Sequence, residues 1–187
     1  MPPKAKVSKE RILQAAMALV RKKGSGALTA KALAATLSCS TQPIFWHYGN
    51  MEALKKDVFQ EALAVFGQYL RRETPAVSPY MSVGLNYIRF ASEEKELFCM
   101  LFMSDFGQTD LFGARVEMEY ILGVIEESGD IRGEDAQTVY RDMWLFSHGI
   151  AAMTATGTAN FSDEEVRTML GDVYRGLVKN LESKKQK

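Results

Sequence analysis

The chain has few cysteines and no long hydrophobic run. Two cysteines, Cys39 and Cys99, occur in 187 residues, far apart and without CxxC or histidine spacing, so neither a disulfide framework nor a zinc site is expected. The apolar run that contains Phe98–Met103 is far too short to span a bilayer, and residues 1–11 lack the apolar core of a signal peptide. The sequence therefore predicts a soluble, cytoplasmic protein with no metal and no membrane partner.

The patterns of catalytic and nucleotide-binding sites are also missing. The two histidines, His47 and His148, are far apart, no nucleophile elbow is present, and the acidic residues cluster at expected helix starts. The Gly24-Ser25-Gly26 stretch follows an expected helix and not a strand, which favours a helix stop over a phosphate loop. No catalytic residue and no cofactor is predicted, and an enzyme is the less favoured class.

Net charge is zero overall but uneven along the chain. Residues 1–60 carry ten lysines and arginines against three acidic residues, a net charge of +7, whereas residues 61–187 carry thirteen against twenty, a net charge of −7. A basic segment joined to an acidic one favours a nucleic-acid-binding module attached to a module that does not bind DNA. A chance fluctuation of composition is the alternative.

Apolar residues recur at helical spacing along the chain, and no convincing strand appears from Pro79 onward. Residues 1–7 form a basic arm, and the first helix is expected from Ser8 to Lys23. Ser162 and Glu165 form a capping box at the start of the last helix. The later helices are expected over residues 80–92, 93–104, 109–128, 133–158 and 162–182. The predicted fold class is all-α.

Two short helices joined by a tight connection occupy residues 29–48, and a long third helix follows to about residue 72. Each of these helices has a suitable cap at its start, namely Thr29, Ser40 and Asn50. Pro43 falls in the first turn of the second helix, where a missing N–H breaks no intrahelical bond. This arrangement predicts a helix-turn-helix unit, whose second helix enters the DNA major groove with its N-terminal residues at the base edges.

The second of these helices reads Ile44-Phe45-Trp46-His47-Tyr48 and is followed by Asn50 and Leu54. With these residues, the region from Ser8 to about Phe66 resembles the N-terminal domain of TetR-family transcriptional regulators. The family pattern is an aliphatic–aromatic–x–His–aromatic string on the recognition helix, followed by a capped helix that ends in Leu. This sequence matches that pattern, and the Gln42-Pro43 pair also occurs in some members. The chain departs from the pattern at three positions: Met51 replaces a phosphate-binding Lys, Pro43 replaces a frequent Thr, and Ser38 replaces the usual Gly of the turn.

The resemblance implies a homodimeric one-component regulator with two domains. Residues 1–66 would form a three-helix DNA-binding domain with the helix-turn-helix, and residues 67–187 a helical effector-binding and dimerisation domain. The implied function is that of a repressor released from a palindromic double-stranded DNA operator by a small hydrophobic ligand. A DNA-binding dimer without an effector pocket is the alternative.

The start of the recognition helix carries the polar residues expected to read DNA. Gln42 can bond adenine N6 and N7 as a bidentate pair, and Pro43 and the Thr41 methyl can touch a thymine methyl. The apolar pair 44–45 is expected in the core. Residues 46–48 carry N–H or O–H groups suited to phosphate oxygens, although the last of them can instead pack in the three-helix core. The expected DNA contacts are Thr29, Lys31, Ser40, Thr41, Gln42, Pro43, Trp46, His47, Tyr48 and Lys55, with Lys56 a further candidate.

The second part of the chain is rich in aromatic residues and methionine. Methionine adapts to irregular shapes, and such residues form pockets for flat or hydrophobic ligands. The TetR resemblance implies an effector pocket in this part of the chain, and the residues then expected to line it are Tyr69, Tyr87, Phe90, Phe98, Phe102, Met103, Met118, Tyr140 and Trp144. A role in an ordinary core is the alternative for each of them.

The last two expected helices each carry an apolar stripe, and small residues over 149–155 allow close helix approach. On this pattern alone, burial inside one chain is the favoured interpretation, whereas the TetR resemblance implies an isologous four-helix bundle between two chains. The expected dimerisation residues are Phe146, Ile150, Met153, Val166, Leu170, Val173 and Leu177. Trp144 with His148-Gly149 also resembles the Trp-His-Gly signature of one TetR subgroup.

Overall fold

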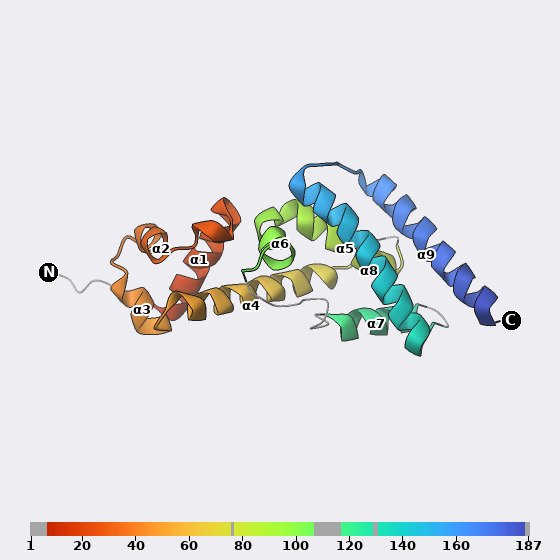
Figure 1. The fold of residues 1–187 in the computed structure, drawn as a ribbon, viewed down its shortest axis with the longest axis horizontal. Coiled ribbons are helices and arrows are strands. Elements are labelled where there is room, and N and C mark those ends of the chain that lie inside the picture. The colour runs from red at the N-terminus through yellow and green to blue at the C-terminus, as the bar shows by residue number, and fades with distance from the viewer. Residues whose placement is uncertain (1–6, 76, 107–116, 129–130, 186–187) are drawn as a thin grey trace. The chain divides into compact units, whose positions relative to one another are not determined.

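The computed structural model describes residues 7–75, 77–106, 117–128 and 131–185, and within these ranges it contains nine α-helices, one short 3-10 helix and no strand (Figure 1). The predicted all-α class is confirmed. The elements are α1 Lys9–Lys23, η1 Ser25–Ala27, α2 Ala30–Thr36, α3 Gln42–Tyr48, α4 Met51–Leu70, α5 Pro79–Glu93, α6 Lys95–Phe102, α7 Met118–Glu127, α8 Gly133–Thr156 and α9 Asp163–Lys185. Residues 1–6 of the expected basic arm and residues 109–116 of the helix expected over 109–128 lie outside the described ranges.

None of the described helices combines the length and apolar character needed to cross a membrane. Across the same residues, no group of three or more histidine, cysteine, aspartate or glutamate side chains is placed to hold a metal ion. Cys39 and Cys99 are both free thiols.

The chain folds into two compact units. Unit 1 consists of Met1–Val65 and Glu94–Thr109, and unit 2 of Phe66–Glu93 and Asp110–Lys187. Because α4 runs past Val65, it contributes residues to both units. In unit 1, α1 packs against α2, α3 and α6, and in unit 2, α5 and α8 pack together and each contacts α7 and α9. Unit 1 thus contains α6, which lies far along the chain from the other helices of that unit.

Four helix starts that the sequence predicts are confirmed by capping bonds. The Ser8 and Thr29 hydroxyls each accept a hydrogen bond from the backbone N–H three residues on, at 3.2 Å. The Asn50 side chain accepts a similar bond at 2.9 Å. Ser162 and Glu165 bond reciprocally, since the Ser162 N–H donates to the carboxylate at 2.8 Å and the Glu165 N–H donates to the hydroxyl at 3.2 Å. These bonds satisfy donors that a first helical turn leaves unpaired, so local sequence determines where these helices begin.

The prediction that Ser40 caps the recognition helix is wrong. α3 begins at Gln42, and Thr41 occupies the N-cap position without a side-chain capping bond. The Thr41 carbonyl accepts from the Ile44 N–H at 3.1 Å, whereas Pro43 has no N–H to donate. The proline that suits the first turn therefore also removes one of the two donors that a capping hydroxyl at Ser40 would use.

Ser38, in the connection between α2 and α3, has a φ of +52°. A side chain in this left-handed region costs about 1–2 kcal/mol, which glycine avoids. After the greater freedom of glycine in the unfolded chain is subtracted, we expect Ser38→Gly to raise the free energy of unfolding by about 0.5–1 kcal/mol, measured by urea denaturation.

Ser40→Gly is the matched control, because Ser40 is not among the residues with positive φ. Glycine there relieves no strain and only increases the entropy of the unfolded chain, so the control should lose stability. A gain of equal size in both variants would show that backbone strain at Ser38 is not the cause.

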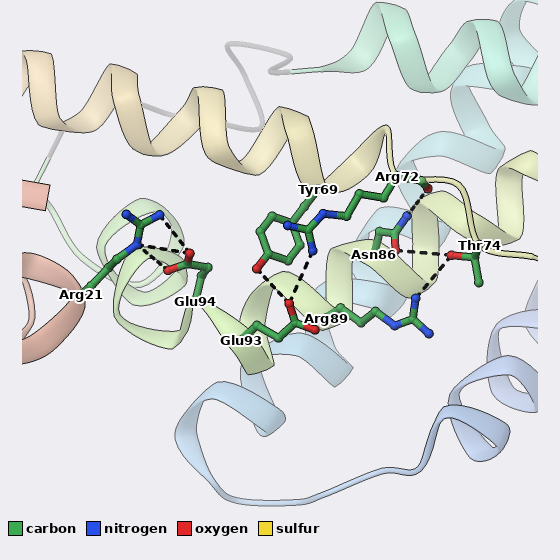
Figure 2. A network of polar contacts seen from close by, with 8 residues as sticks. All are labelled: Arg21, Tyr69, Arg72, Thr74, Asn86, Arg89, Glu93 and Glu94. Carbon is green, nitrogen blue, oxygen red and sulfur yellow. Dashed lines mark hydrogen bonds and ion pairs between the residues drawn. The ribbon is translucent and has the colours of Figure 1, made fainter. Parts of the chain in front are cut away.

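Polar contacts fasten helix ends inside each unit (Figure 2). In unit 2, the Tyr69 hydroxyl donates to the Glu93 carboxylate at 2.9 Å, and the Arg72 guanidinium lies 3.4 Å above the centre of the Tyr69 ring. These contacts hold the end of α4 against α5. In unit 1, the Arg21 guanidinium donates to both oxygens of Glu94 at 2.9 and 3.0 Å, which holds α1 beside the start of α6.

Candidate functional site

The recognition helix α3 has a buried face and an outward face. Ile44 and Tyr48, one turn apart, point into the core of unit 1. Gln42, Phe45 and Trp46 lie on the other side, and the Trp46 side chain is 74% exposed. The outward face of α3 therefore presents a glutamine amide and two aromatic rings, on the element that the sequence predicts to read DNA.

The sequence predicts Phe45 in the core, but this prediction is wrong, because the Phe45 side chain is 41% exposed. Ile44 and Tyr48 already occupy the inward face at i and i+4, and the residue after Ile44 points about 100° away from it around the helix. The outward face of α3 is thus more apolar than expected.

Tyr48 lies in the core, with its side chain 8% exposed. Burial raises the pKa of Tyr48 to about 12, and the carboxylate of Asp57 adds to the rise. The Lys9 ammonium lies 4.9 Å from the centre of the Tyr48 ring and 2.7 Å from a carboxylate oxygen of Asp57. These contacts tie α1 and α4 to the end of α3, so the structure gives Tyr48 the role of holding the recognition helix in position.

His47 connects α3 to the residue before α1. Its Nε2 lies 2.9 Å from the carbonyl oxygen of Val7. Because a carbonyl only accepts, Nε2 carries the hydrogen in this bond. In a neutral imidazole Nδ1 is then an acceptor, so a phosphate oxygen, which also only accepts, would have to replace the Val7 carbonyl at Nε2.

The expected phosphate-binding lysines differ in their surroundings. Lys31 on α2 and Lys56 on α4 are exposed. Lys55 is half-buried, pairs with Glu52 at 3.0 Å and lies 5.9 Å from the centre of the Phe106 ring. A phosphate at Lys55 therefore has to compete with a carboxylate, whereas Lys31 extends from α2 into solvent. Of the remaining expected contacts, Ser40 and Thr29 are exposed and Thr41 and Pro43 are half-buried.

Unit 2 contains a cavity of about 250 Å³. Its walls come from α5, α7, α8 and α9, with one residue just before α5 and one just after α7. The lining residues are Ser78, Tyr80, Met81, Val83, Gly84, Tyr87, Ile121, Ser128, Tyr140, Met143, Trp144, Ser147, Leu170 and Tyr174. No aspartate, glutamate, lysine, arginine or histidine is among them.

The structure brings three of the nine expected ligand residues together at this cavity, namely Tyr87, Tyr140 and Trp144. Phe90 and Met118 are buried without lining it, and Tyr69 bonds Glu93. The other three, Phe98, Phe102 and Met103, belong to unit 1, where the first two pack ring to ring at 5.0 Å.

Tyr80 and Gly84 are lining residues that the sequence reading missed. With Tyr87 they occupy positions i, i+4 and i+7 of α5, so one face of that helix carries two phenols with a gap between them. A Cβ on Gly84 would lie 2.9 Å from the Leu170 side chain, so the glycine lets α9 approach α5 at the cavity wall. The spacing of aromatic residues around a helix-interior glycine was the available signal.

His148 contacts a cavity-lining residue without lining the cavity itself. The Tyr87 hydroxyl lies 3.0 Å from Nδ1 of His148, and the His148 ring stacks on Trp144 with ring centres 5.0 Å apart and planes 10° apart. Burial raises the pKa values of Tyr80 and Tyr87 and lowers the pKa of His148. All three groups are therefore neutral at pH 7.

Burial of neutral His148 makes stability depend on pH. The unfolded chain, in which histidine titrates near about pH 6.5, takes up the proton at higher pH than the folded chain. Stability should therefore fall as the pH drops below about 6.5, until the lowered folded pKa is passed. We expect the melting temperature to fall more steeply for the wild type than for His148→Gln between about pH 7.5 and 5.5. Parallel curves would contradict this linkage.

The last two long helices each leave part of an apolar stripe uncovered. Ile150, Val166 and Leu170, expected at a dimer interface, are buried inside the chain's own core. Phe146, Val173 and Leu177 are half-buried, and Met153 is 39% exposed.

Leu145, which the sequence reading missed, is 55% exposed. With Gly149, Ala152 and Met153 it forms the α8 stripe, at positions i, i+4, i+7 and i+8. On α9, Val173, Gly176 and Leu177 share one face in the same way.

Gly149 and Gly176 have no packing role inside the described part of the chain. A Cβ added to either would meet no heavy atom within 4 Å. Glycine inside a helix costs about 1 kcal/mol relative to alanine, so neither position is explained by the fold of a single chain. Both glycines lie on the uncovered faces, where they permit close approach of another helix.

Comparison with known proteins gives a consistent picture. Residues 12–58 match the family model described as bacterial regulatory proteins, tetR family. The chain is similar in structure to a TetR-like transcriptional regulator from Rhodococcus sp. RHA1, with a TM-score of 0.62 and 19% identity over 95% of this chain and 99% of that chain. It is also similar to a TetR variant from Acinetobacter baumannii AYE in complex with minocycline, with a TM-score of 0.58 and 17% identity over 95% and 98% of the two chains. No curated protein matches the sequence.

Proposed function

The chain is a TetR-family transcriptional regulator, and from this premise we propose that it represses transcription as a homodimer on a palindromic operator until a small hydrophobic ligand releases it. Members of this family are DNA-binding regulators, not enzymes. We assign DNA reading to residues 1–66, and effector binding and dimerisation to residues 67–187, with α6 supporting the DNA-binding part from within unit 1.

The observation that carries the DNA-binding role is the division of α3 into two faces. Ile44 and Tyr48 fix the helix in the core of unit 1, while Gln42 and Trp46 extend outward from its first turns. Residues 1–60 carry a net charge of +7, which favours approach to phosphate. Gln42 then reads a base edge, and Lys31, Trp46 and His47 contact the phosphate backbone.

Homodimerisation is supported by the uncovered α8 stripe and the matching face of α9. A two-fold axis would place these apolar faces, with Gly149 and Gly176, against the same faces of a second copy. Two recognition helices related by that axis would enter successive major grooves, which accounts for a palindromic operator.

The cavity in unit 2 supports the proposed release by a ligand. A ligand that binds one conformation better than another shifts the population toward it by its differential affinity. α4 carries residues of both units. The conformation favoured when a ligand fills the cavity can therefore place α3 differently from the conformation that binds DNA. Repression is relieved when the favoured conformation no longer places both recognition helices in their grooves.

Selection of duplexes from a random library by the purified protein tests the proposal. We expect an enriched palindrome, and fluorescence anisotropy should show tighter binding to the full palindrome than to one half-site. A monomer that does not bind duplex DNA even in dilute salt would overturn the proposal.

Melting temperatures measured with a panel of hydrophobic compounds test whether the protein binds an effector, since a ligand of the folded state raises the melting temperature. A selected operator without any such compound would favour a constitutive DNA-binding dimer.

A further inference from the structure

The chemistry of the cavity wall limits the charge of its ligand. The lining residues with polar side-chain groups are four tyrosines, three serines and Trp144, and the others are apolar. A buried ion needs an opposite charge or a dense set of hydrogen bonds to replace its hydration, because burying an unpaired charge costs several kcal/mol. The wall supplies no opposite charge, so it favours a neutral ligand.

The size and aromatic walls of the cavity favour a small, flat ligand. A volume of about 250 Å³ lies just below the range of about 300–1,000 Å³ that suits drug-sized molecules. Tyr80 and Tyr174 pack with ring centres 5.2 Å apart at one part of the wall, and Trp144 lines another. Ring faces of this kind stack on flat π-systems. A molecule of one or two fused aromatic rings satisfies both conditions.

The Tyr87–His148 pair specifies a polar group on that ligand. When Nδ1 of His148 accepts the Tyr87 proton, the phenol oxygen still has a lone pair for a ligand donor. When Nδ1 carries the hydrogen and donates to the phenol oxygen, the Tyr87 O–H can donate to a ligand acceptor. A hydroxyl on the ligand both donates and accepts, so it can bond Tyr87 in either tautomer.

His148 acts on the ligand through Tyr87. His148 does not line the cavity, but its ring is stacked on Trp144 one turn before it on α8. This stacking orients Nδ1 toward the hydroxyl of Tyr87, and Tyr87 is one of the residues that line the cavity. Three side chains from α5 and α8 thus present one phenol oxygen in a fixed direction.

We propose that the effector is a neutral, flat aromatic molecule that carries a hydroxyl group, that Tyr87 binds this hydroxyl, and that His148 is the positioning residue for Tyr87. The inference rests on the proposed role of the cavity as the effector site. It assigns a chemical role to the Trp144 and His148 residues of the Trp-His-Gly stretch.

The test uses three probes that share a naphthalene ring, with the full-length protein in a calorimeter at pH 7. They are 2-naphthol, which is neutral with a hydroxyl, naphthalene, which lacks the hydroxyl, and 2-naphthoate, which is anionic. Two variants probe the pair: Tyr87→Phe removes the hydroxyl, and His148→Phe keeps a ring against Trp144 but removes Nδ1. Tyr120→Phe is the matched control, because Tyr120 packs against Arg71 away from the cavity lining.

We expect Tyr87→Phe to weaken 2-naphthol binding about fivefold to tenfold, which is the effect of losing one hydrogen bond. The affinity of the same variant for naphthalene should stay within about twofold of the wild-type affinity. His148→Phe should weaken 2-naphthol alone, and the double variant should bind it no worse than Tyr87→Phe, since His148 acts through that hydroxyl. Tyr120→Phe should bind every probe as the wild type does. Unchanged naphthalene binding also shows that each variant is folded.

Equal losses for 2-naphthol and naphthalene would overturn the hydroxyl assignment while leaving a hydrophobic ligand site. Tighter binding of 2-naphthoate than of 2-naphthol would overturn the neutral class. Failure of all three probes to bind the wild type would overturn the inference as a whole. Duplex binding, measured separately by anisotropy, distinguishes these outcomes from failure of the proposed function, since a protein that binds 2-naphthol but no DNA fails only the latter.

Discussion

Leu145→Arg is expected to separate the dimer into monomers and to lower affinity for a palindromic operator by at least about 100-fold. Leu145 is 55% exposed on the α8 stripe, next to Gly149, where the proposed two-fold contact brings helices close together. Because a two-fold contact contains the substituted residue of both chains, two guanidinium groups would face an apolar surface without counter-charges. Loss of the dimer removes the second recognition helix, and with it an effective-concentration gain of about 10²–10⁴.

Analytical ultracentrifugation and anisotropy with the selected palindrome measure this effect. Thr168→Arg is the matched control, because it adds the same charge at an exposed position of α9, on a different side of the helix from Val173 and Leu177. The control should remain dimeric with unchanged operator affinity, and circular dichroism should show both variants helical. A dimeric Leu145→Arg protein with wild-type affinity would place the interface elsewhere.

Gln42→Ala is expected to relax sequence preference at one operator base pair per half-site. Gln42 is the first residue of α3 and is exposed, so its amide can reach a base edge. A bidentate amide–adenine contact contributes about 1–3 kcal/mol of discrimination, so preference at that base pair should fall by roughly 5-fold to 150-fold. Affinity for non-cognate duplexes should hardly change, because a side chain that reads a base edge contributes little to binding the phosphates.

Lys31→Ala is the contrasting variant for the same measurement. Lys31 is exposed on α2 and would contact phosphate, so its loss should weaken all sequences alike and reduce the slope of log affinity against log salt by about 1 per monomer. Repeating the duplex selection with each variant separates the two roles. If both variants lowered specific and random binding by the same factor, Gln42 would not read bases.

Local chemistry explains why much of the helical fold was predictable. The caps at Ser8, Thr29, Asn50 and Ser162 bond only residues three positions away, so a few neighbouring side chains contain the information. Where such a rule failed, at Ser40, another local residue contributed, since Pro43 lacks one of the two N–H donors that the cap would use.

The residues that line the ligand cavity were harder to predict, because they depend on which helices pack against each other. Phe98 and Tyr87 are both buried aromatic residues in helices, yet the first packs in unit 1 and the second lines the cavity in unit 2. Hydrophobicity predicts that each is buried, but it does not specify the partner helix. The contact between Tyr87 and His148 joins residues 61 positions apart and has no signal in local periodicity.

The sequence by itself determined the all-α class, most helix starts, the helix-turn-helix and the basic N-terminal part, because these depend on spacing, caps and charge within short stretches. The tertiary structure decided which aromatic residues line the cavity, which apolar residues of α8 and α9 remain uncovered, and that α6 belongs to unit 1. These features depend on contacts between helices distant in the chain. Helical periodicity identifies an inward face, but only packing determines which element covers it.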